Sequence, residues 1–119
     1  MTALMTLKQV RDVSAALGTG PPACISVFAG RVADTGRDPI SIMAAAVQLL
    51  AIYPHIELIW ASPRELVNIF HADQVGCHII TVTHDLLKKL ALVGKDLDKY
   101  SLDTVKMFRN DAVKTGFRL

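Results

Sequence analysis

Two arginines and a serine are the residues of this chain best suited to bind an anion. Arg31 follows the apolar segment Ala23–Ala29, and Arg64 follows Ile56–Ala61, two residues after Ser62. A guanidinium presents a fork of donors that fits phosphate, and a helix N-terminus adds free N–H groups and a positive dipole end. The spacing therefore indicates a phosphate site. The alternative interpretation is an exposed Arg64 in a helix first turn, with Ser62 acting only as a cap.

The histidines and cysteines suggest neither a metal site nor a nucleophile. His71, Cys77 and His78 are close in the sequence, but alternate strand positions face opposite sides of a sheet. Cys24 and Cys77 lie in apolar segments and are interpreted as small buried hydrophobes of a reduced, cytoplasmic protein. We therefore expect no metal and no other cofactor.

The lysines bear on covalent chemistry. A lysine that forms a Schiff base needs a desolvated, fixed position that lowers its pKa, such as a strand interior offers. All seven lysines fall instead on predicted helices or on the loop before the last helix: Lys8, Lys88, Lys89, Lys95, Lys99, Lys106 and Lys114. We therefore expect no Schiff-base nucleophile in this chain.

Composition limits the class of protein. The 119 residues are 51% hydrophobic and 20% charged, which argues against disorder and predicts one domain, residues 1–119, with a real core. The mean hydropathy of +0.35 suggests strands buried on both faces. A net charge of +2 is too weak to indicate a nucleic-acid or membrane-surface partner. No apolar run reaches the ~18 residues of a membrane span, and no basic region precedes an apolar stretch as in a secretory signal.

Strand and helix signals alternate along the chain. After a brief apolar opening at Thr2–Leu4, strands are predicted over Ala23–Ala29, Ile56–Ala61 and His78–Val82. Helices are predicted after caps at Thr6, Asp38, Ser62, Thr83 and Ser101. Residues 30–38, with Asp34, and residues 94–100 are predicted loops. This order predicts an α/β fold of parallel βα units, in which functional groups lie at the carboxyl ends of the strands.

The same segments resemble the C-terminal half of the transaldolase family, in particular its small members related to fructose-6-phosphate aldolase. ISVFAGRVADTGRDP (Ile25–Pro39) resembles the family's strand-and-loop signature, and WASPRE (Trp60–Glu65) resembles its alanine-serine-x-arginine motif. GCHIITVTHDLLKKL (Gly76–Leu90) and YSLDTVKMFRNDAVKTGFRL (Tyr100–Leu119) resemble the closing strand and terminal helix. The resemblance covers essentially the whole chain.

The resemblance implies about four strands of an eight-stranded βα (TIM) barrel. Family members join and split sugar phosphates through a metal-free Schiff base, as in pentose phosphate metabolism. By position, Arg31, Ser62 and Arg64 match residues that bind the substrate phosphate. Ser26 matches a residue that lines the sugar site, and Phe28 matches an aromatic wall.

The chain also departs from the family pattern. It begins inside the fifth strand, where Thr2 matches a threonine that helps to place the catalytic water. The four earlier strands are absent, and with them the catalytic lysine and the acidic residues that handle protons. Because a half barrel exposes two sheet edges and an apolar inner face, we expect self-association into a homo-oligomer or an upstream half-barrel partner.

Two classes of function are compatible with these features. The first is a transaldolase-like enzyme of sugar-phosphate metabolism, carrying the phosphate-binding half of the site and inactive as an isolated chain. The second is a non-catalytic, phosphosugar-binding or truncated half barrel. The ligand in both is a sugar phosphate, with no nucleic-acid or membrane partner.

Overall fold

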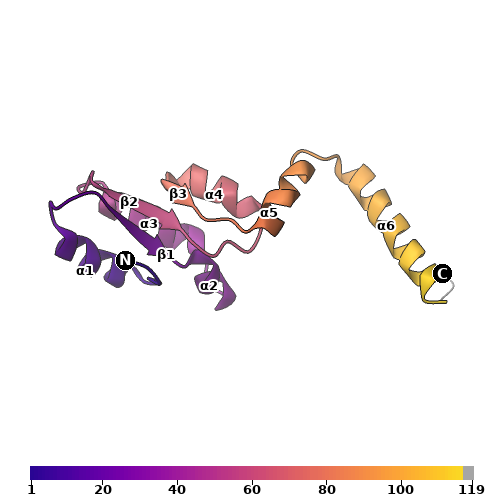
Figure 1. The fold of residues 1–119 in the computed structure, drawn as a ribbon, viewed down its shortest axis with the longest axis horizontal. Helices are drawn as coiled ribbons and strands as arrows, with labels where there is room; N and C mark the ends of the chain where they lie inside the picture. The colour runs from indigo at the N-terminus through magenta and orange to yellow at the C-terminus, as the bar shows by residue number, and fades with distance from the viewer. Residues whose placement is uncertain (117–119) are drawn as a thin grey trace. The chain divides into compact units, whose positions relative to one another are not determined.

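The computed structural model describes residues 1–116, which fall into two compact units, Met1–Lys88 and a second that begins at Lys89. The organisation of residues 1–119 as one domain stays a prediction. The first unit contains, in chain order, α1 (Leu7–Leu17), β1 (Ala23–Val27), α2 (Ala29–Asp34), α3 (Pro39–Leu50), β2 (Ile56–Trp60), α4 (Val67–Val75), β3 (Ile79–Ile80) and α5 (His84–Lys88) (Figure 1).

The sheet of the first unit is parallel, with strand order β1-β2-β3. Strand β1 pairs with β2 from Ala23 opposite Ile56 to Val27 opposite Trp60. Strand β2 pairs with β3 over two residues, and Leu4 adds an isolated parallel bridge to Val27. The predicted parallel βα units are therefore confirmed. Of the predicted opening strand, Thr2–Leu4, only the bridge at Leu4 is formed. Strand β3 is shorter than predicted.

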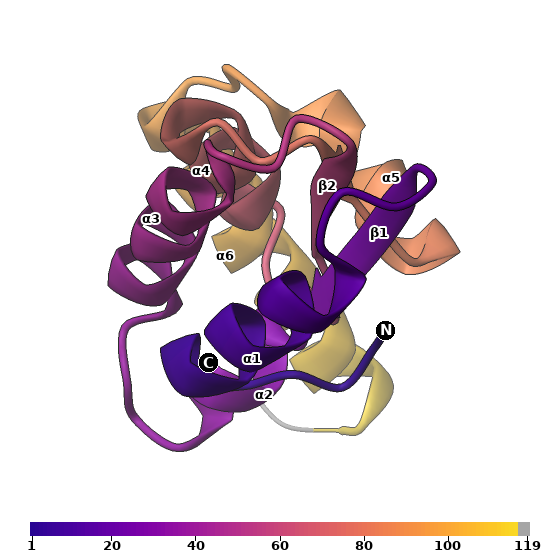
Figure 2. The ribbon, with the colours of Figure 1, turned by 90° about the vertical axis from the view of Figure 1, so that its left-hand side faces the viewer.

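One face of the sheet forms the core. Ile25, Leu58 and Trp60 are buried there against helices α1 and α3, which contribute Val10 and Met43. Helices α3 and α4 lie side by side against the strands (Figure 2). Burial of each large apolar side chain stabilises the fold by roughly 1.5–3 kcal/mol.

The opposite face of the sheet is open, so the predicted burial of both faces is wrong. Strand β2 alternates between buried and more accessible residues, with Glu57 exposed. The interpretation of Cys24 as buried is wrong as well, since it is exposed on β1, whereas Cys77 is half-buried. Mean hydropathy could not predict this exposure, because it does not show whether a second layer of helices covers each face of the sheet.

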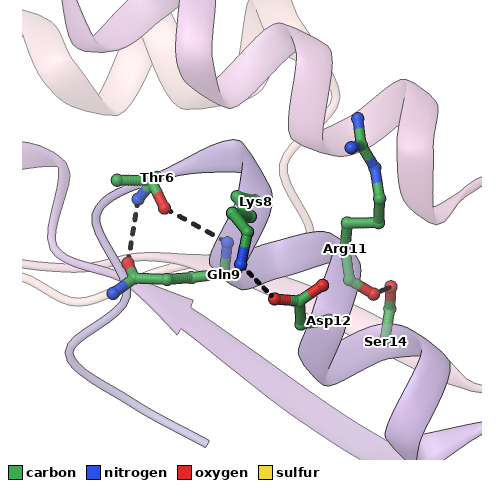
Figure 3. Close-up of polar contacts among 6 residues, drawn as sticks. All are labelled: Thr6, Lys8, Gln9, Arg11, Asp12 and Ser14. Atoms are coloured by element: carbon green, nitrogen blue, oxygen red, sulfur yellow. Dashed lines mark hydrogen bonds and ion pairs between the residues drawn. The ribbon is translucent and has the colours of Figure 1, made fainter.

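Helix α1 begins where its sequence predicts. The Thr6 hydroxyl accepts from the Gln9 backbone N–H at 3.1 Å, and the Gln9 side-chain oxygen accepts from the Thr6 N–H at 3.0 Å (Figure 3). This reciprocal pair is a capping box, which satisfies donors that a helix leaves unpaired at its start. Helix α1 is thereby fixed directly after the segment that pairs with β1.

Thr6→Ala is expected to lower the free energy of unfolding by about 1 kcal/mol, because the Gln9 N–H loses its acceptor. Chemical denaturation measures the change. Thr6→Ser keeps the hydroxyl and is the matched control, expected to recover most of the loss. Equal stability of the alanine and serine variants would contradict a capping role.

Two helical segments differ from the prediction. Residues 30–38 were predicted to be a loop, yet Ala29–Asp34 forms α2, because the Phe28 carbonyl accepts from the N–H groups of Arg31 and Val32 at 3.1 Å each. The helix predicted after Thr83 is divided into α5 and a 3-10 turn over Lys89–Leu92. Thr83 itself does accept from the Leu86 N–H, as predicted for a cap.

The second unit consists of that 3-10 turn and α6 (Leu97–Lys114). Helix α6 begins after Asp96, whose carboxylate accepts from the Lys99 N–H, so the predicted start after Ser101 is wrong. Aspartate caps a helix as well as serine does. The last three residues of the family-like segment, 117–119, lie outside the described residues.

Candidate anion-binding site

Two chain segments meet at the carboxyl ends of β1 and β2. The first is the start of α2, and the second is the turn from Ala61 to Leu66. The Gly30 N–H donates to the Ala61 carbonyl at 3.3 Å. A Cβ at Gly30 would overlap the Ser62 carbonyl oxygen and lie 2.7 Å from its carbon. The two segments are therefore packed backbone against backbone, which only glycine permits.

Arg64 reaches from the second segment to the end of α2. Its Nη2 lies 2.6 Å from Oδ2 of Asp34 and its Nε lies 3.2 Å from Oδ1, which is a two-pronged ion pair. The hydrogen bond from Arg64 lowers the pKa of the Asp34 carboxyl, and the positive charges of Arg64 and Arg31 add to the effect. The same bond raises the pKa of Arg64. Both side chains are about half exposed.

Arg31 lies on α2, one turn before Asp34. Its Cζ is 5.8 Å from the centroid of the Phe28 ring, within the range of a cation–π contact. Arg31 is exposed and makes no ion pair with any residue in the described part of the chain. Asp34 is therefore paired with Arg64 alone, and the Arg31 guanidinium is not neutralised by an ion pair within residues 1–116.

Ser62 does not cap a helix, contrary to the prediction. Its φ of 57° is left-handed, a conformation that costs a non-glycine residue of order 1 kcal/mol, and α4 begins only at Val67. The Asn68 side-chain oxygen accepts from the N–H groups of Arg64 and Glu65 at 2.9 Å each. The N–H groups of Arg64 and Glu65, which the predicted helix start would present to an anion, are therefore already paired.

The remaining residues matched to the family site lie along β1 and its neighbouring segment. Ser26 and Phe28 are half-buried, and Thr2 is exposed. The Ser26 N–H donates to the Met1 carbonyl at 2.9 Å, and the Leu4 N–H donates to the Ser26 carbonyl at 3.3 Å. These bonds hold the segment that carries Thr2 alongside Ser26.

Other reactive groups are placed in structural roles. Burial raises the pKa of the Cys77 thiol to about 11, so this thiol is protonated at neutral pH. His78 Nδ1 accepts from the Leu58 N–H at 3.0 Å. Residues 1–116 contain no group of three His, Cys, Asp or Glu side chains placed to hold a metal. None of the helices formed by these residues is long and apolar enough to cross a membrane.

Sequence reasoning missed two residues of this arrangement. Asp34 was interpreted as a loop residue, although its spacing of three from Arg31 puts both on one side of a helix once α2 is recognised. Asn68 carried no signal, because its role depends on the left-handed turn at Ser62.

Parallel βα units, with arginines after the carboxyl ends of neighbouring strands, define part of a βα barrel. The family model for transaldolase and fructose-6-phosphate aldolase matches residues 1–119, and the chain belongs to this family. Both the resemblance and the half-barrel fold class are therefore confirmed.

Individual relatives agree with the family match. The chain is 30% identical over 88 residues to a probable transaldolase of Syntrophomonas wolfei, covering 71% of this chain and 41% of the relative. It is 31% identical over 88 residues to a probable transaldolase of Caldicellulosiruptor saccharolyticus, with 70% and 41% covered. A probable transaldolase of Methanococcus maripaludis is 29% identical over 83 residues, with 66% and 39% covered. The chain thus spans about two-fifths of the length of these curated relatives.

Proposed function

We propose that this chain binds the phosphate group of a sugar phosphate with Arg31, Ser62 and Arg64. The observation that carries the proposal is the contact of Gly30 with the Ser62 backbone, which fixes the two arginine-bearing segments to each other. Arginine forks recognise phosphate in two-pronged geometry, and the Arg64–Asp34 pair demonstrates that Arg64 can adopt it. Family membership supports a phosphorylated ligand.

The sugar portion of the ligand would extend from the arginines along β1. Ser26 is accessible on the open face of the sheet, and the Phe28 ring is half-buried beside Arg31. Thr2 is carried by the segment that pairs with β1 and would help to place a water molecule there. These assignments rest on family membership and on the placement of these residues along β1 and the segment that pairs with it.

The chain would supply the phosphate-binding part of a transaldolase-like site, without the lysine nucleophile. The seven lysines lie on α1, α5 and α6, on the 3-10 turn, or between that turn and α6. None is in a strand of the described sheet, where a Schiff-base lysine would be desolvated. This placement also favours the second candidate, a non-catalytic phosphosugar-binding protein.

Completion of the half barrel, by a second copy or by an upstream half-barrel, is part of the proposal. The first unit has an open sheet face and a short edge strand, β3, whose Ile79 is exposed. Unpaired strand edges and exposed apolar side chains favour association, either with a second copy or with an upstream half-barrel. The two unpaired cysteines support a reduced, cytoplasmic setting.

Arg31→Ala and Arg64→Ala are each expected to weaken inorganic phosphate binding about ten-fold, because each removes charged hydrogen-bond donors. Calorimetric titration of the full chain at low ionic strength measures the dissociation constants. Arg11→Ala is the matched control, since it removes the same charge from an exposed position on α1. Equal phosphate affinity in all three variants and the parent would refute the proposed site.

A further inference from the structure

Asp34 is placed where an anionic ligand of Arg64 would bind. We propose that Asp34 is a specificity-determining residue that limits phosphate affinity, because its carboxylate occupies the guanidinium fork that phosphate must use. The inference rests on the proposed function and adds an intramolecular competitor to it. Both carboxylate oxygens of Asp34 are engaged by Arg64.

The path of the Arg64 side chain supports competition at one site. A Cβ at Gly30 would lie 3.2 Å from Arg64 Nε, so this side chain passes over the start of α2 before it reaches Asp34 at the helix end. The backbone contact of Gly30 with Ser62 holds the two segments at this separation. A carboxylate and a phosphate present similar paired oxygens to such a fork, so they cannot both occupy it.

The free-energy cost of displacing the Asp34 carboxylate from Arg64 is small enough for phosphate to overcome. The ion pair is about half exposed on both sides, and exposed pairs contribute little to stability. Phosphate brings up to two negative charges in place of the single charge of Asp34, while Arg31 remains available beside it. A dianion can therefore displace the carboxylate, whereas a singly charged anion gains little net attraction by doing so.

Asp34→Asn separates competition from structural support. Asparagine has the same size and keeps a neutral oxygen for Arg64, but it removes the charge. If Asp34 competes with phosphate, the variant binds inorganic phosphate about two- to five-fold more tightly, the range expected for an exposed ion pair. If Asp34 instead holds Arg64 in a binding conformation, affinity falls or stays the same, and the inference is overturned.

The experiment titrates inorganic phosphate into the full chain by calorimetry at low ionic strength. Asp12→Asn is the matched control, because Asp12 is an exposed partner of Lys8 at 3.2 Å and its loss changes the net charge equally. We expect the gain in Asp34→Asn and Asp34→Ala, little gain in Asp12→Asn, and no gain when Asp34→Asn is added to Arg64→Ala. Circular dichroism verifies that each variant is folded.

The outcomes distinguish this inference from the proposed function. Weaker binding in Arg31→Ala and Arg64→Ala, without tighter binding in Asp34→Asn, overturns the role of Asp34 and leaves the phosphate site in place. Phosphate affinity that is insensitive to both arginines overturns the site, and the role of Asp34 with it. A gain that persists in the Asp34→Asn, Arg64→Ala double variant would contradict competition for the Arg64 fork.

Discussion

Gly30→Ala is expected to lower the free energy of unfolding by about 3 kcal/mol or more. The added Cβ would overlap the Ser62 carbonyl oxygen, which belongs to the backbone and cannot rotate away. Gly30 is the second residue of α2, where alanine would ordinarily stabilise the helix by roughly 0.5–1 kcal/mol. The expected sign is therefore opposite to helix propensity, and only the contact with Ser62 explains it.

Gly36→Ala is the control for this prediction. Gly36 has a φ of +83°, and a Cβ there would meet no atom within 4 Å. Its replacement should cost about 1 kcal/mol from backbone strain alone. Urea unfolding of both variants measures the difference. A Gly30→Ala variant no less stable than Gly36→Ala would show that the two segments are not in close backbone contact.

The same contact makes Gly30 a test of the site. If the variant remains folded, the start of α2 must move away from Ser62, and Arg31 moves with it relative to Arg64. Phosphate affinity should then fall even though both arginines are still present. The backbone contact therefore links the stability of this end of the sheet to the geometry of the proposed site.

Local signals in the sequence were sufficient for much of the fold. The capping box at Thr6, the Asp38-Pro39 start of α3 and the left-handed Gly76 that ends α4 are each determined by a few neighbouring residues. Strands β1 and β2 were predicted within two residues of their observed ends because they are short, apolar and bounded by turn residues.

The parts that the sequence did not reveal depend on contacts between distant segments. The sequence Ser62-Pro63-Arg64-Glu65 has every local sign of a helix start, yet Ser62 is left-handed and α4 begins five residues later. Its backbone is held by Gly30, which is 32 positions earlier in the chain. Packing against Gly30 therefore outweighed the local preference of this segment to start a helix. Such exceptions are expected at strained turns, which often lie at functional sites.

The role of Asp34 in the candidate site could not be predicted from the sequence for the same reason. Its partner Arg64 is 30 residues away in the sequence, so no local pattern could reveal the ion pair. The two arginines could be selected by residue type and by their place after neighbouring strands. The carboxylate that neutralises one of them became evident only when α2 was seen to bring Asp34 to Arg64.

Borohydride reduction of the chain with fructose 6-phosphate is expected to give no stoichiometric adduct. An imine forms from a neutral amine, which a lysine provides most readily from a desolvated position that its surroundings hold fixed. Lys8, by contrast, is 82% exposed on α1 and pairs with Asp12. A lysine in a desolvated strand position would form the imine, and the described strands hold none.

Intact-mass spectrometry after reduction measures the result directly. A full-length transaldolase relative, treated in parallel, is the positive control and should gain the mass of one reduced sugar phosphate per chain. An adduct of the same stoichiometry on this chain would contradict the proposed absence of a nucleophile, and Lys→Arg variants would then identify the residue. If only the relative is labelled while Arg31 and Arg64 still govern phosphate binding, phosphate recognition and imine formation are separable functions of this barrel, and this chain retains the first.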